Sequence, residues 1–421
     1  ADTVTLDTWY GRDTGHTVAN RWTVNAKDYQ FDGSADVGTC IWNMDSLHFG
    51  SESSVRANKL SIETGTFDGI CDLKGKSIKV HAEKANFDKE SLFKGTDVNV
   101  SFDKGTYAAK IVATAHASLH SKSDVDLEAG SEVKGEKSAS VVSDTNVTIG
   151  EGASVTSQGQ TYIKADRVTN HGEVTGGKQA IVIGEEEAHN FGTVKSTEVG
   201  GLVEVRGAKV HNGGNIKAVR GTAVLTTREQ ADQDSESPGE LRGNATTSEN
   251  SILEGDFTVV EGKKVDHSGQ AFGMKEVAFI ASDKINVHDT SRVEGPRVYF
   301  EARVINDVED LLDGKGCYKG LKVGELLGVK TGEAVNLSRK HHTTFSLDLT
   351  GSHVELDRGA SLESDKFISV TATDGSIINR AGKIRGGIFT NLEASQDVIN
   401  DHYAHHFLGH IGDGKYSDQV K

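Results

Sequence analysis

With 48 glycines and only 2 prolines among its 421 residues, the chain is typical of a protein built from short strands and tight turns. Its formal net charge of −16 at pH 7 argues against nucleic acid and anionic membrane surfaces as partners, because both repel negative charge. No apolar run approaches the length that spans a bilayer, so we do not expect the chain to be membrane-embedded.

Residues 1–54 differ from the rest because they hold all three tryptophans, Trp9, Trp22 and Trp42. One interpretation is an aromatic binding face. The other, which we favour, is an N-terminal cap or widened first coil that covers the open end of a stack of repeats. The chain begins at Ala1 rather than at Met, which suits either a mature secreted chain or a fragment of a longer one.

From residue 55 short apolar alternations are bounded by Gly, Asp or Asn, and between residues 124 and 220 the phrase Asn-x-Gly-x-[Val/Ile] returns three times. A period of about twenty residues is the signature of a solenoid, in which each repeat hides its apolar side chains by stacking on its neighbours. We therefore expect residues 55–400 to form a parallel β-helix. The apolar residues that close successive phrases, including a sister phrase with Gly in second place, are Val133, Val155, Val174, Val194 and Ile216.

The asparagines and glycines of the phrase have expected structural roles. Both residue types tolerate the left-handed backbone conformation of a sharp corner. Coils in register would also place the asparagines above one another, so that their side-chain amides form a hydrogen-bonded ladder. The alternative is a set of unrelated Asn-Gly turns in an antiparallel sandwich. The turn and ladder residues are Asn170, Gly172, Asn190, Gly192, Asn212, Gly214, Asn379 and Gly382.

Two segments interrupt the pattern. Residues 226–251 are polar, charged and contain Pro238, so we expect a loop outside the stack. Residues 307–345 have a leucine spacing that suggests one or two helical turns packed on the flank, with His341 and His342 solvated. Without the cap and the insertions, about sixteen coils are expected.

Metal and thiol chemistry give weak signals. Residues 401–421 are expected to be a polar tail or cap, and they hold His402, His405, His406 and His410. On a helix some of these histidines share a face and would hold zinc, but no Glu lies between them in a His-Glu-x-x-His arrangement, so no metal site is assigned.

Other cofactor motifs are missing from the sequence. No P-loop, calcium nonapeptide, nucleophile elbow or zinc cysteine pattern occurs, so we predict no cofactor. Cys40 and Cys71 are either bridged between neighbouring coils or buried as free thiols.

The Asn-x-Gly-x-Ile phrases resemble the repeat region of filamentous-haemagglutinin-like exoproteins, the secreted partners of two-partner secretion systems, over about residues 120–400. The resemblance implies a right-handed parallel β-helix and a role in adhesion or in display of a distal domain at the cell surface. The Asn-Pro-Asn motifs of that family's N-terminal secretion domain are missing. The sequence therefore suits an internal segment of a long fibre or a different β-helical surface protein.

Taken together, we expect an all-β protein, a right-handed parallel β-helix with an N-terminal cap and two insertions. The expected function is structural or adhesive: a segment of a secreted or cell-surface fibre that binds a surface or matrix ligand, protein or glycan, or displays other domains. One alternative is a polysaccharide lyase or glycoside hydrolase with acidic residues on one sheet. Another is a self-associating subunit of an extracellular filament. Because aromatics are sparse in the middle coils, we assign no catalytic residue.

Overall fold

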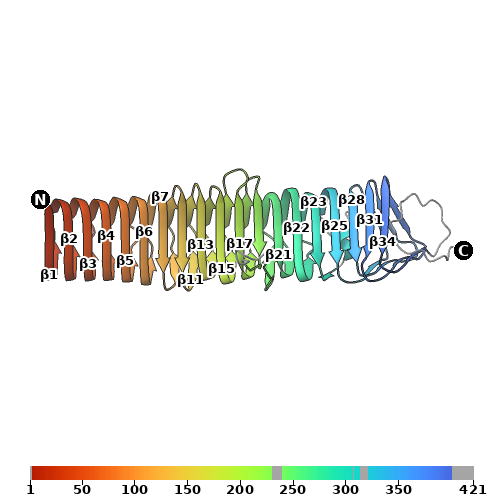
Figure 1. Cartoon of the computed structure of the whole chain (residues 1–421), viewed down its shortest axis with the longest axis horizontal. Helices are drawn as coiled ribbons and strands as arrows, with labels where there is room; N and C mark the ends of the chain where they lie inside the picture. The colour runs from red at the N-terminus through yellow and green to blue at the C-terminus, as the bar shows by residue number, and fades with distance from the viewer. Residues whose placement is uncertain (1, 230–238, 307, 313–320, 401–421) are drawn as a thin grey trace. The chain divides into compact units, whose positions relative to one another are not determined.

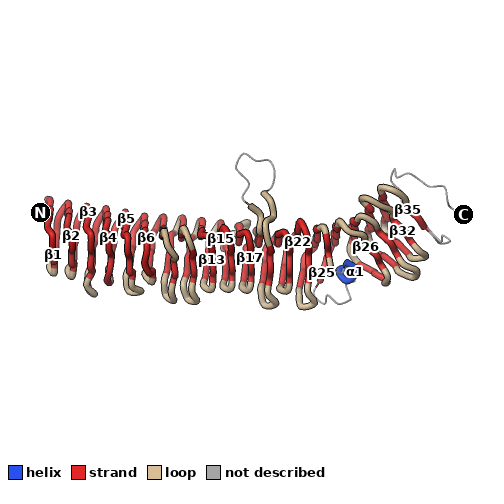
Figure 2. Tube along the Cα trace, turned by 90° about the horizontal axis from the view of Figure 1, so that it is seen from below, coloured by secondary structure: helices blue, strands red, loops and turns tan. Residues whose placement is uncertain are grey.

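The computed structural model describes residues 2–229, 239–306, 308–312 and 321–400. Within these ranges the chain is built from β-strands joined by short turns, and the one helix is the five-residue α1 (Val308–Leu312). The chain divides into two compact units, residues 1–207 with 214–219 and residues 208–213 with 220–421. Each is a stack of coils (Figures 1 and 2).

The strands of the first unit are long at first and short later. They are β1 (Thr3–Asp13), β2 (His16–Phe31), β3 (Ser34–Phe49), β4 (Ser54–Gly69), β5 (Asp72–Phe87), β6 (Leu92–Tyr107), β7 (Lys110–Ser121), β8 (Val125–Leu127), β9 (Glu132–Gly135), β10 (Ser138–Ser143), β11 (Asn146–Ile149), β12 (Ser154–Ser157), β13 (Gln160–Asn170), β14 (Glu173–Gly176), β15 (Gln179–Asn190), β16 (Thr193–Ser196) and β18 (Asn215–Ala218). The residues of β17 (Leu202–Asn212) are shared between the two units.

The strands of the second unit follow the same plan. They are β19 (Thr222–Thr226), β20 (Asn244–Thr247), β21 (Ile252–His267), β22 (Gln270–Val287), β23 (Arg292–Ala302), β24 (Val304–Ile305), β25 (Leu321–Thr331), β26 (Val335–Leu337), β27 (Lys340–Thr343), β28 (Ser346–Gly351), β29 (Val354–Leu356), β30 (Ser361–Ser364), β31 (Phe367–Ala372), β32 (Ile377–Asn379), β33 (Lys383–Gly386), β34 (Phe389–Ala394) and β35 (Val398–Asn400).

Within the described ranges the named strands pair in parallel, and paired residues lie one coil apart in sequence. Ser54 of β4 pairs with Asp72 of β5, and Ser138 of β10 pairs with Gln160 of β13. The closing residues Val133, Val155, Val174, Val194 and Ile216 pair in that order, and each is fully buried. The expected all-β parallel β-helix is therefore confirmed.

Each coil has three faces. The pairing of β3 with β4 skips Gly38 and Asp45, so each long strand bends twice and is divided into three straight segments. In the later coils the same three faces are separate strands, which form distinct sheets such as β26-β29-β32-β35 and β27-β30-β33.

The core consists of the side chains that point into the coil from all three faces. In β1–β6 it is filled by aromatic rings, and successive rings such as Phe49, Phe67 and Phe87 pack in tilted orientations with centroids 5.2 and 4.8 Å apart. In the following coils smaller Val, Ile and Ala side chains fill the same space.

Residues 1–54 form regular coils, because β1, β2 and β3 pair with the same parallel register as the strands that follow. Trp22 and Trp42 lie in the interior, with ring centroids 5.0 Å apart, whereas Trp9 is 72% exposed. Cys40 and Cys71 are buried free thiols and not a disulfide.

The first insertion is shorter than expected. The chain leaves the stack after β19 and returns at β20, and the base of the insertion is an antiparallel bridge between Arg228 and Leu241. Thr246 and Thr247, which fall inside the expected loop, already pair with β21.

The second insertion is also shorter, and the expected helical turns are correct only in part. Leu311 and Leu312 are buried in α1, which lies beside β26 (Figure 2). From Leu321, however, the chain is strand again, because β25 pairs in parallel with β23 and β28. The solenoid has about 19 turns instead of sixteen, since coils occupy segments expected to be cap or insertion.

Candidate functional site

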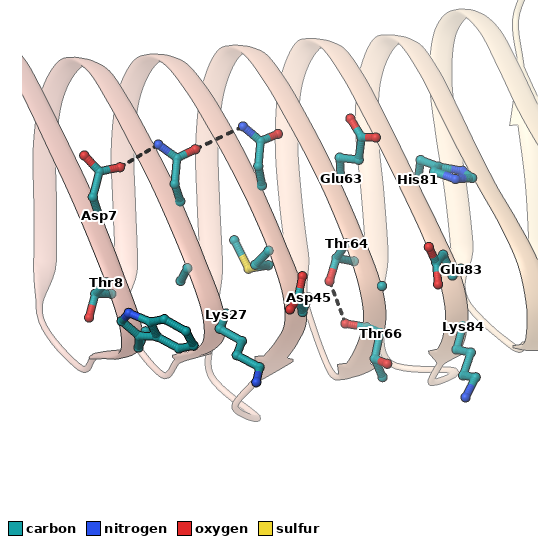
Figure 3. Close-up of a pocket in the computed structure, with 16 residues that line it drawn as sticks. Asp7, Thr8, Lys27, Asp45, Glu63, Thr64, Thr66, His81, Glu83 and Lys84 are labelled. Atoms are coloured by element: carbon teal, nitrogen blue, oxygen red, sulfur yellow. Dashed lines mark hydrogen bonds between the residues drawn. The ribbon is translucent and has the colours of Figure 1, made fainter.

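A groove of about 1140 Å³ crosses β1–β5 on one face of the first unit (Figure 3). We call it the N-terminal groove. It lies where these strands make their second bend, and it runs across the strands rather than along them. Figure 3 shows side chains of successive coils reaching into it in rows.

One wall of the groove is a row of side chains from equivalent positions, Asp7, Asn25, Asn43, Glu63 and His81. Parallel register aligns them, so each side chain lies beside its counterpart in the next coil. The amide of Asn25 donates to Asp7 Oδ1 at 2.6 Å, and the amide of Asn43 donates to Asn25 Oδ1 at 3.2 Å. Those hydrogen bonds hold the amide part of the wall in place.

The floor and the other wall come from the bend itself. Thr8, Ala26, Met44 and Thr64 occupy one register position before the bend and form the floor. Thr8 Oγ1 donates to the carbonyl of Tyr10 at 2.9 Å, and Thr64 Oγ1 donates to the carbonyl of Thr66 at 2.8 Å. Both bonds cross the bend, so they fix the chain direction where the groove opens.

The bend positions themselves form the second wall, and they are Trp9, Lys27, Asp45, Gly65 and Glu83. Strand pairing skips these positions, which leaves their side chains directed outward. Lys27 Nζ lies 5.6 Å from the centroid of the Trp9 ring, a cation–π distance. The ring remains largely open to solvent.

Three acidic side chains of the groove have no partner in the part of the chain that the structure describes. Many outer acids pair with a base one coil away, for example Asp103 with Lys122 at 3.0 Å and Glu173 with Lys195 at 2.8 Å. Asp45, Glu63 and Glu83 make no hydrogen bond or ion pair among the residues that the structure describes. The groove thus carries carboxylates that are open to a ligand.

Of the groove residues, the sequence analysis singled out Trp9 alone, in the aromatic binding face that was the less favoured interpretation. The sequence pattern that could have identified the groove is the spacing of Trp9, Lys27 and Asp45, which lie eighteen residues apart. That period is shorter than the one visible between residues 124 and 220, so a search at about twenty residues does not align the rows.

The turn residues that the sequence singled out lie inside the stack. Asn170, Asn190 and Asn212 are fully buried, and the Asn170 amide donates to Asn190 Oδ1 at 2.8 Å. Asn379 is only partly buried, and its side chain bonds both the N–H and the carbonyl of Gly382 within one turn. These asparagines stabilise corners and offer no group to a ligand.

The glycines of the Asn-x-Gly-x-[Val/Ile] phrase are needed for a different reason than the one expected. Gly172, Gly192 and Gly214 do not have the left-handed conformation. A Cβ at Gly192 would lie 2.2 Å from the carbonyl oxygen of Gly172, and one at Gly214 would lie 2.1 Å from that of Gly192. Close approach between coils, not backbone handedness, therefore requires glycine here.

A second hollow, of about 510 Å³, lies on one flank of β21, β22, β23 and β25. Four glycines, one from each strand, open it: Gly255, Gly273, Gly295 and Gly324. Its remaining lining is mostly apolar and includes Met274, and Arg292 covers the ring of Phe272 at 5.1 Å.

His341 is buried, which corrects the expectation of a solvated histidine pair. Its position in β27 points inward, whereas His342 points outward. His341 Nε2 lies 3.2 Å from Glu309 Oε1 of α1. Burial opposes ionisation of Glu309, but hydrogen bonds from Ser338, His341 and Arg339 outweigh it and hold its pKa below the usual value.

Metal and membrane features are not found in the described part of the chain. No group of three or more His, Cys, Asp or Glu residues there is arranged to hold a metal ion. No helix in the same ranges is long and apolar enough to cross a membrane. The histidines at 402, 405, 406 and 410 lie outside the described residues.

No protein family model, curated protein or solved structure matches this chain.

Proposed function

We propose that this chain is a structural and adhesive segment of a secreted or cell-surface β-helical fibre, which binds a surface or matrix ligand through its outer faces. The resemblance to filamentous-haemagglutinin-like exoproteins gives the same expectation. The extracellular location and the ligand are part of the proposal.

The observation that carries the proposal is the set of ion pairs between charged side chains on the outer faces of neighbouring coils. Bases and acids from neighbouring coils pair with each other, such as Lys122 with Asp103, Lys195 with Glu173, and Lys383 with Glu363 at 2.7 Å. Each exposed pair contributes little, but repetition over many coils keeps the faces ordered. Such faces suit a scaffold whose role is to hold a binding surface in place.

The test is adhesion of the purified full chain. We expect saturable retention of labelled protein on intact cells or on immobilised matrix proteins and glycans, with no release of reducing ends from the glycans. Retention on none of these surfaces would overturn the proposal, and release of reducing ends would favour a hydrolase instead. Electron micrographs of the same sample distinguish single segments from growing filaments, which would favour self-assembly instead.

A second candidate is a glycoside hydrolase, and the unpaired carboxylates of the N-terminal groove favour it. Hydrolysis needs one carboxyl group as acid and another as nucleophile or base. Asp45, Glu63 and Glu83 come from three consecutive strands and line the same groove.

The hydrolase candidate predicts that Glu63→Gln or Glu83→Gln abolishes release of reducing ends from a polysaccharide. Glu52→Gln is the matched control, because Glu52 is exposed in the turn before β4 and lies outside the groove. Absence of any release by the unaltered chain would leave the adhesive function as the better account.

A further inference from the structure

We infer that the N-terminal groove binds an amino-sugar oligosaccharide that lies across β1–β5. The inference rests on the proposed adhesive function and names the chemical class of its ligand. It follows from the ring, the charges and the polar walls of the groove.

The first observation is the exposed ring at one end of the groove. Trp9 is 72% exposed, and it lines the groove while the equally exposed Tyr10 beside it does not. An indole with an open face offers a flat apolar surface and a polar edge. The C–H face of a pyranose ring matches that surface, and Lys27 already shows that a cation fits against the ring.

The second observation is the balance of charge. Four carboxylates, Asp7, Asp45, Glu63 and Glu83, line the groove against the two lysines Lys27 and Lys84. Three of the carboxylates have no partner in the described structure, as set out above. A ligand with ammonium groups would pair with them, whereas a polyuronate would place carboxylates against carboxylates.

The third observation separates a glycan from a peptide. Apart from Trp9, the apolar side chains of the lining are Ala26 and Met44, and the rest are hydroxyl, amide or charged groups. Protein partners are held by an apolar interface core, which this groove lacks. Hydroxyl-rich sugar rings instead match rows of Asn, Thr and carboxylate groups.

The repeat of the groove suits a polymer. Parallel strands lie about 4.8 Å apart, so five strands present equivalent groups over about 19 Å. A chain of identical sugar units can therefore meet one row of side chains per strand. This length accommodates several units, which is how modest individual contacts give specific retention.

The experiment is calorimetric titration of the full chain with hexamers of glucosamine, N-acetylglucosamine and galacturonic acid. We expect the glucosamine hexamer to bind, the N-acetylated hexamer to bind about tenfold more weakly, and the galacturonate hexamer to give no signal. Raising the salt concentration should weaken glucosamine binding, because ion pairs contribute to it.

Variants assign the binding to the groove. Trp9→Ala and the double variant Glu63→Gln with Glu83→Gln should each weaken glucosamine binding by about tenfold or more. Tyr10→Ala and Glu52→Gln, which alter equally exposed residues outside the groove, should bind as the unaltered chain does. Trp9→Phe should retain most of the affinity, and unchanged circular dichroism establishes that each variant is folded.

Three results would overturn the inference: preference for galacturonate, equal binding by all groove variants, or binding of a lysine-rich peptide with the same response to the variants. The two proposals fail separately. Loss of glucosamine binding with intact retention on surfaces rejects the groove ligand alone, whereas glucosamine binding without retention on any surface rejects the adhesive function.

Discussion

Glycines in this protein meet two different physical demands. Gly130, Gly152 and Gly359 have positive φ angles of 90, 80 and 86°, a conformation that side chains disfavour. Gly192 has no such angle, but the preceding coil leaves no room for a side chain. The first group can be replaced at the cost of local strain, whereas the second would push two coils apart.

This difference predicts unequal effects of the same substitution. Gly192→Ala should lower the urea midpoint of the first unit markedly, because its Cβ would meet backbone that cannot move alone. Gly130→Ala should cost about 1–2 kcal/mol, since a Cβ there meets no atom within 4 Å and only the left-handed angle is strained. Equal midpoints for the two variants would contradict this explanation.

The buried asparagine ladder can be tested in the same unit. Asn190→Leu removes the acceptor of the Asn170 amide and leaves that amide buried without it, which should destabilise the protein by about 1–3 kcal/mol. Asn86→Leu is the control, because Asn86 also bonds between coils but is exposed. An unchanged thermal midpoint for Asn190→Leu would show that the ladder does not contribute.

Buried His267 should make the second unit sensitive to acid. Its side chain bonds Thr247 Oγ1 at 2.7 Å and packs on Phe279, and burial, assisted by His288, lowers its pKa to about 3. Between this value and the usual value near 6.5, the unfolded chain binds a proton that the folded chain does not. Stability should therefore fall by about 1.4 kcal/mol for each unit that the pH drops through this window.

The measurement is the unfolding free energy between pH 4 and pH 6, compared with His267→Gln. In the variant, the unfolding free energy should fall less steeply as the pH drops, because only the carboxylates still contribute to its pH dependence. Identical slopes for the two proteins would mean that His267 does not remain neutral in the folded state.

At the scale of elements, the first insertion is anchored by an ion pair. Arg228 Nη2 and Nε lie 2.7 and 3.0 Å from the two carboxylate oxygens of Glu261, which also accepts a hydrogen bond from Thr226. Glu261 is buried, so its charge depends on this partner. The ion pair thereby fixes the start of the first insertion to β21.

Arg228→Met should destabilise the second unit by about 3 kcal/mol, because it leaves a buried carboxylate unpaired. Adding Glu261→Gln should restore most of the loss, since a neutral amide needs no cation. Urea unfolding of the two single variants and the double variant measures the coupling, and strictly additive effects would argue against a paired role.

At the scale of the whole molecule, stability is expected to be local. In a solenoid each coil contacts its neighbours, so damage should spread over adjacent coils and not over the entire chain. Phe67→Ala removes a fully buried ring stacked between Phe49 and Phe87 and should cost about 3–5 kcal/mol.

Hydrogen exchange measures which strands the substitution destabilises. Phe67→Ala should increase exchange in β3–β5 and leave the strands of the second unit protected as before. Phe191→Ala, at an exposed ring, is the control and should change exchange little. A uniform rise in exchange in both units would instead indicate one cooperative structure.

The sequence predicts the fold best where the period is even. The closing residues from Val133 to Ile216 pair as their spacing indicates, because one inward side chain per coil must be apolar. The first coils are harder to recognise in the sequence, since steps of eighteen and twenty residues follow one another in no fixed order. The leucines of β25 fit helical spacing as well as strand spacing, and its parallel pairing with neighbouring strands decides for strand.

The candidate site could not be predicted from the sequence for a related reason. Trp9, Glu63 and Glu83 come together through a register that depends on the length of every intervening turn. A change of one residue in any coil moves the rows, so composition alone cannot place them.

The parallel register also has an evolutionary consequence. Glu173 and Thr193 occupy equivalent places in successive coils, so loss of residues 173–192 would place Thr193 directly after Gly172, where Glu173 stood. Nothing else in the pairing need change, and the reverse event, a duplication, would lengthen the protein by the same unit. Such a gene can therefore gain or lose one coil at a time, while the side chains of the N-terminal groove stay unchanged.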